Sequence, residues 1–198
     1  MAALSIPFPQ YNDPSADVPG IAVLAGGCFW CTEAVYRAMD GVRSVVSGYT
    51  GGAKETANYQ AVCTGITDHA EAVQIDFDPQ KLSFGRLLQV FFGVAHDPTQ
   101  LDRQGNDVGS QYRSAIFAVN QAQADFAHHY IAELNQARVF SQPIVTQVVL
   151  LREFYPAEGY HQDYARRNPS QPYICAVAQP KVDKLHQRFP EYLRKQES

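Results

Sequence analysis

The chain has 198 residues, a formal net charge of −4 and 45% hydrophobic residues, which fits a single globular domain and argues against a nucleic-acid partner. It holds four cysteines, too few at this length for a secreted disulfide framework, and no apolar run long enough to cross a membrane. Because the N-terminus lacks a basic region followed by an apolar core, we expect no secretory signal, no membrane partner and a cytoplasmic protein.

Residues 1–19 differ in composition from the rest of the chain. They contain four prolines and many polar residues, so we expect an extended N-terminal arm ahead of one domain over residues 20–198. In chain order we then expect a strand at 21–25, a helix to Asp40, a strand at 42–49 and a polar loop to Asn58. A strand at 71–77 and a helix from Ser83 through Phe92 should follow, and then a long polar loop over 96–112. The last part should hold a strand at 114–119, a helix at 121–138, a strand at 145–151, an irregular stretch after Pro156 and a helix from Pro180.

This order of elements predicts the α+β class. Its first part matches a split β-α-β arrangement, in which helices pack on one face of a mostly antiparallel sheet. The loop over 96–112 is long for a segment with no structure of its own, and loops of that length more often carry function.

The stretch from Gly26 to Glu33 joins the first strand to the first helix. Cys28 falls at or near the helix N-terminus, where unpaired N–H groups and the helix dipole favour a thiolate over a thiol. Cys31 is three residues further on, and positions i and i+3 of a helix lie close enough for a disulfide. The stretch therefore offers a nucleophilic sulfur with a second sulfur within reach.

Three other interpretations of this cysteine pair compete with a catalytic one. Half of a zinc site would need two further ligands, and the sequence has no second Cys-x-x-Cys or His-x-x-x-His pair to supply them. A thioredoxin-like redox pair and two inert buried cysteines both stay open on the pattern alone.

Further segments follow the cysteine pair in an order that makes the chain similar to a known family. The segments are Gly27-Cys28-Phe29-Trp30, Ser47-Gly48-Tyr49-Thr50-Gly51-Gly52, Asn58-Tyr59, His69-Ala70-Glu71, His96-Asp97-Pro98, the run from Arg103 to Ser114, Tyr160-His161-Gln162-Asp163-Tyr164 and Pro180-Lys181-Val182. Together they resemble the peptide methionine sulfoxide reductase A family from about residue 20 to about residue 190.

The resemblance implies a repair enzyme that reduces the S epimer of methionine sulfoxide, free or in oxidised proteins and peptides, to methionine. It implies no metal and no bound organic cofactor, with thioredoxin as reductant in the cell and dithiothreitol in vitro. The family's fold resembles the ferredoxin-like split β-α-β that the pattern indicates, and we expect a monomer.

The reaction needs a thiolate, a proton donor and an apolar pocket, because the oxygen of a sulfoxide leaves only when it is protonated. Cys28 is the candidate nucleophile. The resemblance places Glu71 beside it as the acid, since an apolar site helps a carboxyl to keep its proton. It also assigns the hydroxyls of Tyr59 and Tyr112 to the sulfoxide oxygen. Without the resemblance, Glu71 would be the polar side of a strand.

Four more residues are candidates for substrate binding. Phe29 and Trp30 would line the pocket for the S-methyl group. Asp107 would shape the site or bond the main chain of a bound methionine, and the resemblance puts His161 at the pocket edge.

Recycling is where this sequence departs from many relatives, which have glycine at the position of Cys31 and resolve with cysteines near the C-terminus. The tail after Lys195 has no cysteine, so Cys31 is the expected resolving thiol for a sulfenic acid at Cys28. Whether Cys175 passes a disulfide outward stays open, and Cys63 is expected to be a buried small residue.

Two rival functions remain. A thioredoxin-like oxidoreductase usually has Trp before its first cysteine, whereas Trp30 lies between the two here, and it would leave Glu71 and Tyr112 without a role. A non-catalytic module that binds oxidised methionine would need the aromatic pocket but not two cysteines.

Overall fold

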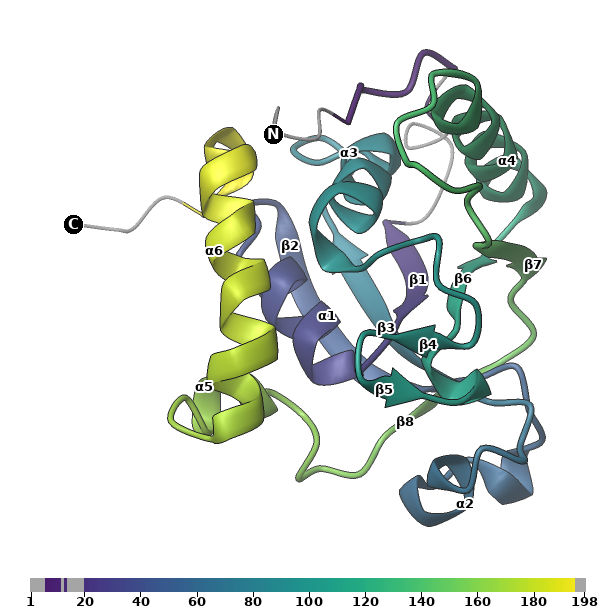
Figure 1. The fold of residues 1–198 in the computed structure, drawn as a ribbon, viewed down its shortest axis with the longest axis vertical. Helices are drawn as coiled ribbons and strands as arrows, with labels where there is room; N and C mark the ends of the chain where they lie inside the picture. The colour runs from purple at the N-terminus through teal and green to yellow at the C-terminus, as the bar shows by residue number, and fades with distance from the viewer. Residues whose placement is uncertain (1–5, 12, 14–19, 195–198) are drawn as a thin grey trace.

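The computed structural model describes residues 6–11, 13 and 20–194, in which strands and helices are arranged around one main sheet (Figure 1). The elements are β1 (Ile21–Gly26), α1 (Phe29–Arg37), β2 (Val42–Thr50), α2 (Tyr59–Cys63), β3 (Ala70–Phe77), α3 (Phe84–Val90), β4 (Arg103–Gln104), β5 (Asp107–Val108), β6 (Ser114–Ala118), α4 (Gln121–Gln136), β7 (Gln147–Leu150), β8 (Phe154–Pro156), α5 (Tyr164–Arg167) and α6 (Gln179–Arg188). Short π-helical turns follow α3 and precede α6, at Phe91–Ala95 and Ile174–Ala178.

Within the described residues the main sheet has six strands in the order β7-β6-β1-β3-β2-β8. The pairings of β1 with β3, β1 with β6, β2 with β3 and β2 with β8 are antiparallel, and that of β6 with β7 is parallel. The sheet is therefore mixed. A separate two-stranded hairpin, β4 with β5, lies in the segment that the sequence predicted to be a long loop.

The helices cover one face of this sheet. One apolar cluster joins side chains of the strands, such as Leu24 and Ile75, to Tyr36 of α1, Leu87 of α3 and Phe126 of α4. The other face carries a smaller cluster that includes Val23, Ala72 and Phe117 of the central strands and is flanked by Leu151 and Phe154, which lie at the two ends of the connection from β7 to β8. Since most of the large buried side chains belong to the cluster on the helical face, that face holds the main core.

Local capping explains where several helices begin. Ser83 accepts a hydrogen bond from the backbone N–H of Arg86, and Asn120 accepts one from that of Gln123. Such bonds satisfy N–H groups that the first helical turn leaves without a partner. The predicted helix start at Ser83 is confirmed, and Asn120 caps the helix predicted over 121–138.

Besides the β4–β5 hairpin, two further parts of the fold differ from the sequence prediction. The polar loop after Thr50 ends in α2, which Asn58 caps through the N–H of Ala61. The stretch after Pro156, predicted to be irregular, contains α5 and a π-helical turn. Each of these short helices packs through contacts distant in the chain, which a local hydrophobic pattern does not encode.

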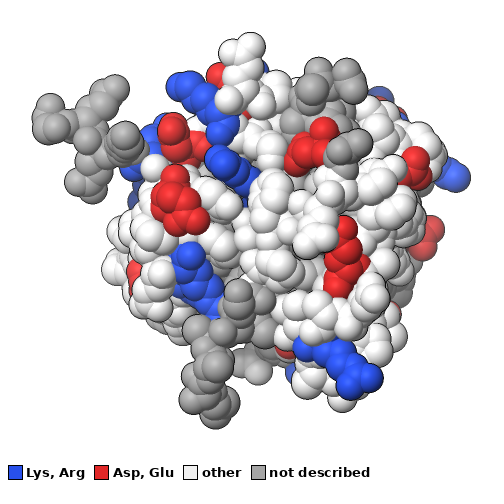
Figure 2. All heavy atoms as spheres, turned by 90° about the horizontal axis from the view of Figure 1, so that it is seen from above, with Lys and Arg blue, Asp and Glu red and all other residues white. Residues whose placement is uncertain are grey.

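Part of the predicted N-terminal arm, residues 1–5, 12 and 14–19, lies outside the described residues. The described part packs on the domain: Ile6 is buried, and the carbonyl of Pro7 accepts a hydrogen bond of 2.6 Å from Tyr130 of α4. On the face shown in Figure 2, acidic and basic side chains of the described residues are interspersed. In the part of the chain that the structure describes, no helix has the length and apolar character needed to cross a bilayer.

Candidate active site

Cys28 stands at the turn between β1 and α1, as the sequence predicted. It is the N-cap residue of α1, and its carbonyl accepts the backbone N–H of Cys31 at 3.1 Å. The turn requires Gly27, whose φ is +87° and at which a Cβ would lie 2.7 Å from the side chain of Gln104. A glycine is thus needed both for the conformation and for the close approach of the β4 strand.

Glu71 comes from β3, the strand beside β1. Its neighbours Ala70 and Ala72 belong to the cluster on the far face of the sheet, so alternation along the strand directs Glu71 to the helical face. There its carboxylate accepts the backbone N–H of Phe29 at 3.1 Å, one residue after Cys28. The prediction that Glu71 lies beside Cys28 is consistent with this contact, and Glu71 is only 3% exposed.

Burial raises the pKa of Glu71 to about 8, with smaller contributions from the negative charges of Asp107 and Cys31, while the N–H of Phe29 acts in the opposite direction. A carboxyl with such a pKa is mostly protonated at neutral pH, because desolvation penalises its charged form. The site therefore contains a proton donor of the carboxylic acid type.

Cys28 and Glu71 both line a cavity of ≈ 110 Å³. Its lining consists of Cys28, Phe29, Trp30, Tyr59, Glu71, Asp107, Tyr112 and Tyr173. These residues come from α1, α2, β3, β5, the turn before β6 and the segment before the second π-helical turn. Seven of the nine candidates named from the sequence line this one cavity, and Cys31 and His161 lie next to it.

Tyr59 and Tyr112 bring two hydroxyl groups to the cavity. A hydrogen bond with Cys63, together with burial, raises the pKa of Tyr59 to about 12. Burial also raises the pKa of Tyr112, and the negative charge of Glu71 adds to this effect. Both hydroxyls keep their protons at neutral pH and can donate to an oxygen in the cavity.

His161 stands behind the aromatic wall of the cavity and is 1% exposed. Its Nδ1 accepts the indole N–H of Trp30 at 3.2 Å, and its ring lies 5.1 Å from that of Phe29 and 4.6 Å from that of Tyr59. Burial lowers the pKa of His161, which keeps the imidazole neutral as an acceptor for Trp30. The residue touches three lining residues.

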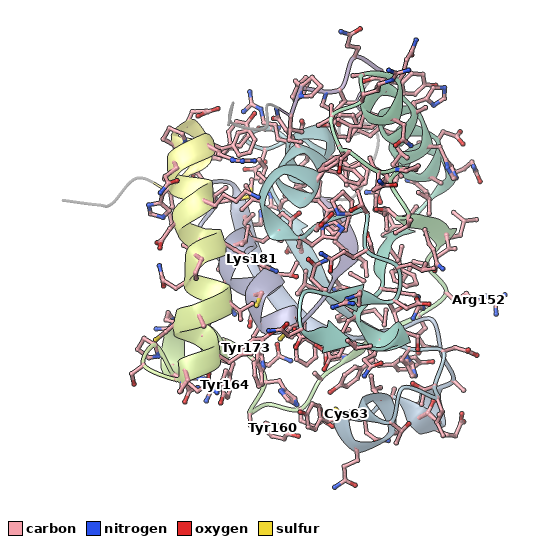
Figure 3. The ribbon with its side chains drawn as sticks, in the orientation of Figure 1. Cys63, Arg152, Tyr160, Tyr164, Tyr173 and Lys181 are labelled. Atoms are coloured by element: carbon pink, nitrogen blue, oxygen red, sulfur yellow. The ribbon has the colours of Figure 1, made fainter. Side chains whose placement is uncertain are left out.

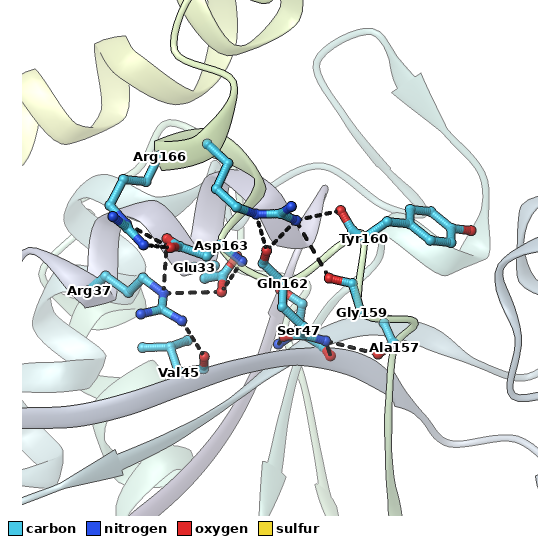
Figure 4. A network of polar contacts seen from close by, with 11 residues as sticks. Glu33, Arg37, Val45, Ser47, Ala157, Gly159, Tyr160, Gln162, Asp163 and Arg166 are labelled. Atoms are coloured by element: carbon cyan, nitrogen blue, oxygen red, sulfur yellow. Dashed lines mark hydrogen bonds and ion pairs between the residues drawn. The ribbon is translucent and has the colours of Figure 1, made fainter.

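A polar network fixes the segment that carries His161 (Figure 4). The carboxylate of Glu33 on α1 accepts the backbone N–H of Asp163 at 2.9 and 3.0 Å and the guanidinium of Arg37 at 3.1 Å. The side chain of Gln162 bonds both the N–H and the carbonyl of Ser47 on β2. These contacts hold the turn around His161 against the first helix and the sheet.

Cys31 lies one helical turn after Cys28 and is 0% exposed. The two cysteines form an apolar cluster with Ile174 and Ala178 of the C-terminal segment. Burial raises the pKa of the Cys28 thiol well above its usual value, whereas the hydrogen bond from Cys28 and the charge of Lys181 lower the pKa of Cys31. The position of Cys28 at the helix N-terminus predicted a thiolate, but burial opposes this effect because it favours the neutral thiol.

Tyr173 is a residue of the site that the sequence did not reveal. Its hydroxyl donates to the carboxylate of Asp107 at 2.5 Å and lies 3.9 Å from the sulfur of Cys31. In Figure 3 it is labelled beside α1, at the start of the C-terminal helical segment. Its only signal in the sequence is an aromatic residue in an irregular stretch, and no periodic pattern marks it.

The other two cysteines lie at the surface, and for Cys63 the prediction of a buried residue is wrong. Cys63 ends the short helix α2, whose outer side faces solvent. Cys175 is also exposed, and its thiol donates to the carbonyl of Pro169 at 3.2 Å. Its neighbour Ile174 packs on the cysteine pair instead. Among the described residues, no three side chains of the His, Cys, Asp or Glu type are grouped to hold a metal ion.

Comparison with known proteins shows which family this sequence is similar to. Residues 20–193 match the family model described as peptide methionine sulfoxide reductase. The chain is 53% identical over 169 residues to peptide methionine sulfoxide reductase MsrA 2 of Mesorhizobium japonicum, covering 85% of this chain and 87% of that one.

The fold of this chain is also similar to that of solved structures. Reduced Mxr1 from Saccharomyces cerevisiae superimposes with a TM-score of 0.72 at 34% identity, covering 76% of this chain and 86% of Mxr1. Mxr1 in complex with Trx2 gives a TM-score of 0.51 at 26% identity, covering 73% and 84% of the two chains.

Proposed function

The chain belongs to the peptide methionine sulfoxide reductase family, and we propose that it reduces the S epimer of methionine sulfoxide, free or in oxidised proteins and peptides, to methionine. One observation carries this proposal: a thiol, a carboxylic acid and two tyrosine hydroxyls line a single small cavity with an aromatic wall. The product is repaired methionine, and the oxygen leaves as water.

The acid of the reaction is Glu71. A sulfoxide is a poor electrophile until its oxygen is protonated, and a glutamate with a pKa of about 8 keeps its proton at neutral pH. The hydroxyls of Tyr59 and Tyr112, both protonated, donate to the same oxygen and stabilise the charge that develops on it.

Cys28 is the nucleophile. Because burial raises the pKa of the Cys28 thiol, this residue is a thiol in the enzyme without substrate. It loses its proton only as it attacks the sulfoxide. Glu71 passes its proton to the sulfoxide oxygen, and its carboxylate then takes the proton of Cys28. The N-terminus of α1, at which Cys28 is the cap, favours the negative charge on sulfur during this exchange.

Phe29 and Trp30 give the cavity its apolar wall, where the S-methyl group of the substrate binds. His161 holds Trp30 through the indole N–H, which makes it a support of this wall rather than a group that touches the substrate. Asp107 lines the polar side and is available to the main chain of a bound methionine.

Release of methionine leaves a sulfenic acid on Cys28, which Cys31 resolves to a disulfide. Cys31 follows Cys28 by three residues at the start of α1, and the two thiols share a hydrogen bond. Thioredoxin, or dithiothreitol in vitro, then reduces the disulfide. The solved complex of Mxr1 with the thioredoxin Trx2 supports this reductant.

We further propose that strands β6-β1-β3-β2 with α1 and α3 form a ferredoxin-like split β-α-β core, to which β7, β8 and the C-terminal helices are added. Residues 20–198 would act as one catalytic domain with residues 1–19 as an arm. The protein would work in the cytoplasm as a monomer.

The experiment that tests the function is reduction of each sulfoxide epimer separately. The protein is incubated with the S or the R epimer of N-acetyl-methionine sulfoxide and dithiothreitol, and the product, N-acetyl-methionine, is quantified by chromatography. Turnover of the S epimer alone is expected, and thioredoxin with its reductase and NADPH should replace dithiothreitol. Absence of N-acetyl-methionine from both epimers would overturn the proposal.

A further inference from the structure

The burial of Cys31 raises a question that the reduction of the sulfoxide does not answer: where its proton goes. The residue is 0% exposed, enclosed by the cluster that includes Ile174 and Ala178. To attack the sulfenic acid of Cys28 it must react as a thiolate, because the thiol is a weak nucleophile. A group inside the protein must therefore accept the proton.

The structure offers one continuous path from this sulfur. The thiol of Cys31 donates to the hydroxyl oxygen of Tyr173 at 3.9 Å, within the reach of a hydrogen bond from sulfur. The same hydroxyl donates to the carboxylate of Asp107 at 2.5 Å. Both bonds point the same way, from thiol to hydroxyl to carboxylate. The hydroxyl can thus receive one proton as it gives up another.

From these contacts we propose that Tyr173 and Asp107 form a proton relay that activates Cys31 for resolution of the sulfenic acid, a role that rests on the proposed reductase function. Asp107 is the acceptor, and Tyr173 transmits the proton. Both residues also line the cavity that contains Cys28, so the path ends beside the reacting sulfurs.

The charged and titratable groups around Cys31 fit this direction of transfer. Cys28 lies on its own helix, Tyr173 on the C-terminal segment, Asp107 on β5 and Lys181 on α6. The positive charge of Lys181 stabilises the thiolate of Cys31 once its proton has left, and in Figure 3 Lys181 is labelled beside α1. Glu71 cannot be the acceptor at this point, because it starts the step protonated and must supply a proton to the leaving group.

Atoms and protons balance within the site. The proton of Cys31 moves to the oxygen of Tyr173, whose own proton moves to Asp107. The electron pair on the Cys31 sulfur forms the S–S bond with Cys28 as the S–O bond of the sulfenic acid breaks. The departing hydroxide takes the proton of Glu71 and leaves as water, so the step needs no external oxidant or reductant.

The test uses Tyr173→Phe, which keeps the ring and removes only the relay hydroxyl. It measures two chemical steps separately in this variant, the release of methionine and the formation of the disulfide. One equivalent of the S epimer of N-acetyl-methionine sulfoxide is mixed with reduced enzyme, and quenched samples are analysed for N-acetyl-methionine (the methionine product), for dimedone-trapped sulfenic acid and for the Cys28–Cys31 disulfide by mass spectrometry. We expect disulfide formation to slow by about 10²-fold or more, the usual contribution of a positioned base, and by more than methionine release. Asp107→Asn should slow it to a similar extent.

The pH dependence distinguishes a relay from a structural role. Raising the pH ionises Cys31 without help, so the defect of Tyr173→Phe in disulfide formation should shrink between about pH 6 and about pH 9, close to the span over which a free thiol ionises. The double variant Tyr173→Phe/Asp107→Asn should be no slower than the single variants, since the two residues act in series. Tyr164→Phe is the matched control, because Tyr164 belongs to the same cluster but contacts Trp30 with its ring face.

Each outcome has a distinct meaning. If the unmodified enzyme releases no methionine, the proposed function fails. If methionine is released and Tyr173→Phe forms the disulfide as fast as the parent, the relay is wrong. A defect of the same size at all pH values, or one shared by Tyr164→Phe, would assign Tyr173 a packing role instead and would also overturn the relay.

Discussion

The buried carboxyl of Glu71 places opposite demands on activity and stability, and Glu71→Gln tests both in one protein. The amide has the same shape and can still accept the backbone N–H of Phe29, whose bond to Glu71 measures 3.1 Å. It cannot ionise and cannot give a proton. We therefore expect a variant that is more stable at neutral pH and nearly inactive.

The magnitude follows from the shift in pKa. Glu71 has a pKa of about 8 in the folded protein against 4.5 for an ordinary glutamate. Below 4.5 both folded and unfolded chains hold the proton, so the group does not affect stability. As the pH rises above 4.5 the unfolded chain ionises first, and the native state loses stability until the pH passes the folded value. At about pH 7 the loss is about 3 kcal/mol, at about 1.4 kcal/mol for each pKa unit.

Two measurements check this expectation. Guanidinium unfolding should show Glu71→Gln more stable than the parent by less than about 1 kcal/mol at about pH 5 and by about 3 kcal/mol at about pH 7. Release of methionine in a single turnover should slow by about 10²-fold or more, the usual contribution of a positioned acid. Glu55→Gln, at an exposed carboxylate, is the control. A gain in stability that is equal at both pH values would refute a protonated Glu71, and an unchanged single-turnover rate would assign the proton to another group.

The remaining predictions concern the cysteines. Cys28→Ser should abolish sulfoxide reduction even with excess dithiothreitol, and residual turnover above a few per cent would contradict the assignment, since loss of a nucleophile usually costs on the order of 10⁴-fold or more. Cys31→Ser should still release one methionine per protein and leave a dimedone-reactive sulfenic acid, while thioredoxin-supported turnover collapses; undiminished turnover would require another resolving thiol. Cys63→Ser/Cys175→Ser should recycle at close to the parent rate, because both thiols are exposed and Cys63 lies on α2. Loss of thioredoxin-supported turnover in Cys175→Ser alone would instead make Cys175 a carrier of the disulfide.

Features that depend on neighbouring residues could be predicted from the sequence. The glycine at position 27 and the apolar run before it predict the turn that places Cys28 at the end of α1. The capping side chains Ser83 and Asn120 mark helix starts for the same reason, since each bonds an N–H group three residues away.

Features that depend on contacts between residues far apart in the chain could not be predicted from the sequence. Tyr173 reaches the site because the segment after Asn168 folds back over α1, 142 residues from its contact at Cys31. The exposure of Cys63 depends on α2, a helix of 5 residues in which Val62 is buried and Cys63 is exposed. A single cysteine in an apolar context does not show on which side of a short helix it will lie. The position of Glu71 on the helical face came from family resemblance, because alternation within a strand fixes two faces but not which of them is buried.

Asp107 links the two halves of the catalytic cycle, and this link makes a last prediction. Its negative charge contributes to the raised pKa of Glu71, which helps Glu71 to hold the proton that the sulfoxide needs. When Asp107 receives the proton of Cys31 in the second step, that charge disappears, the pKa of Glu71 falls, and Glu71 releases its proton to the departing hydroxide more readily. Asp107→Asn removes the charge permanently. The pH at which methionine release declines in single turnovers, about 8 in the parent, should therefore move to a lower value. The same substitution should slow disulfide formation, and a decline that stays at the parent pH would show that Asp107 does not act on Glu71.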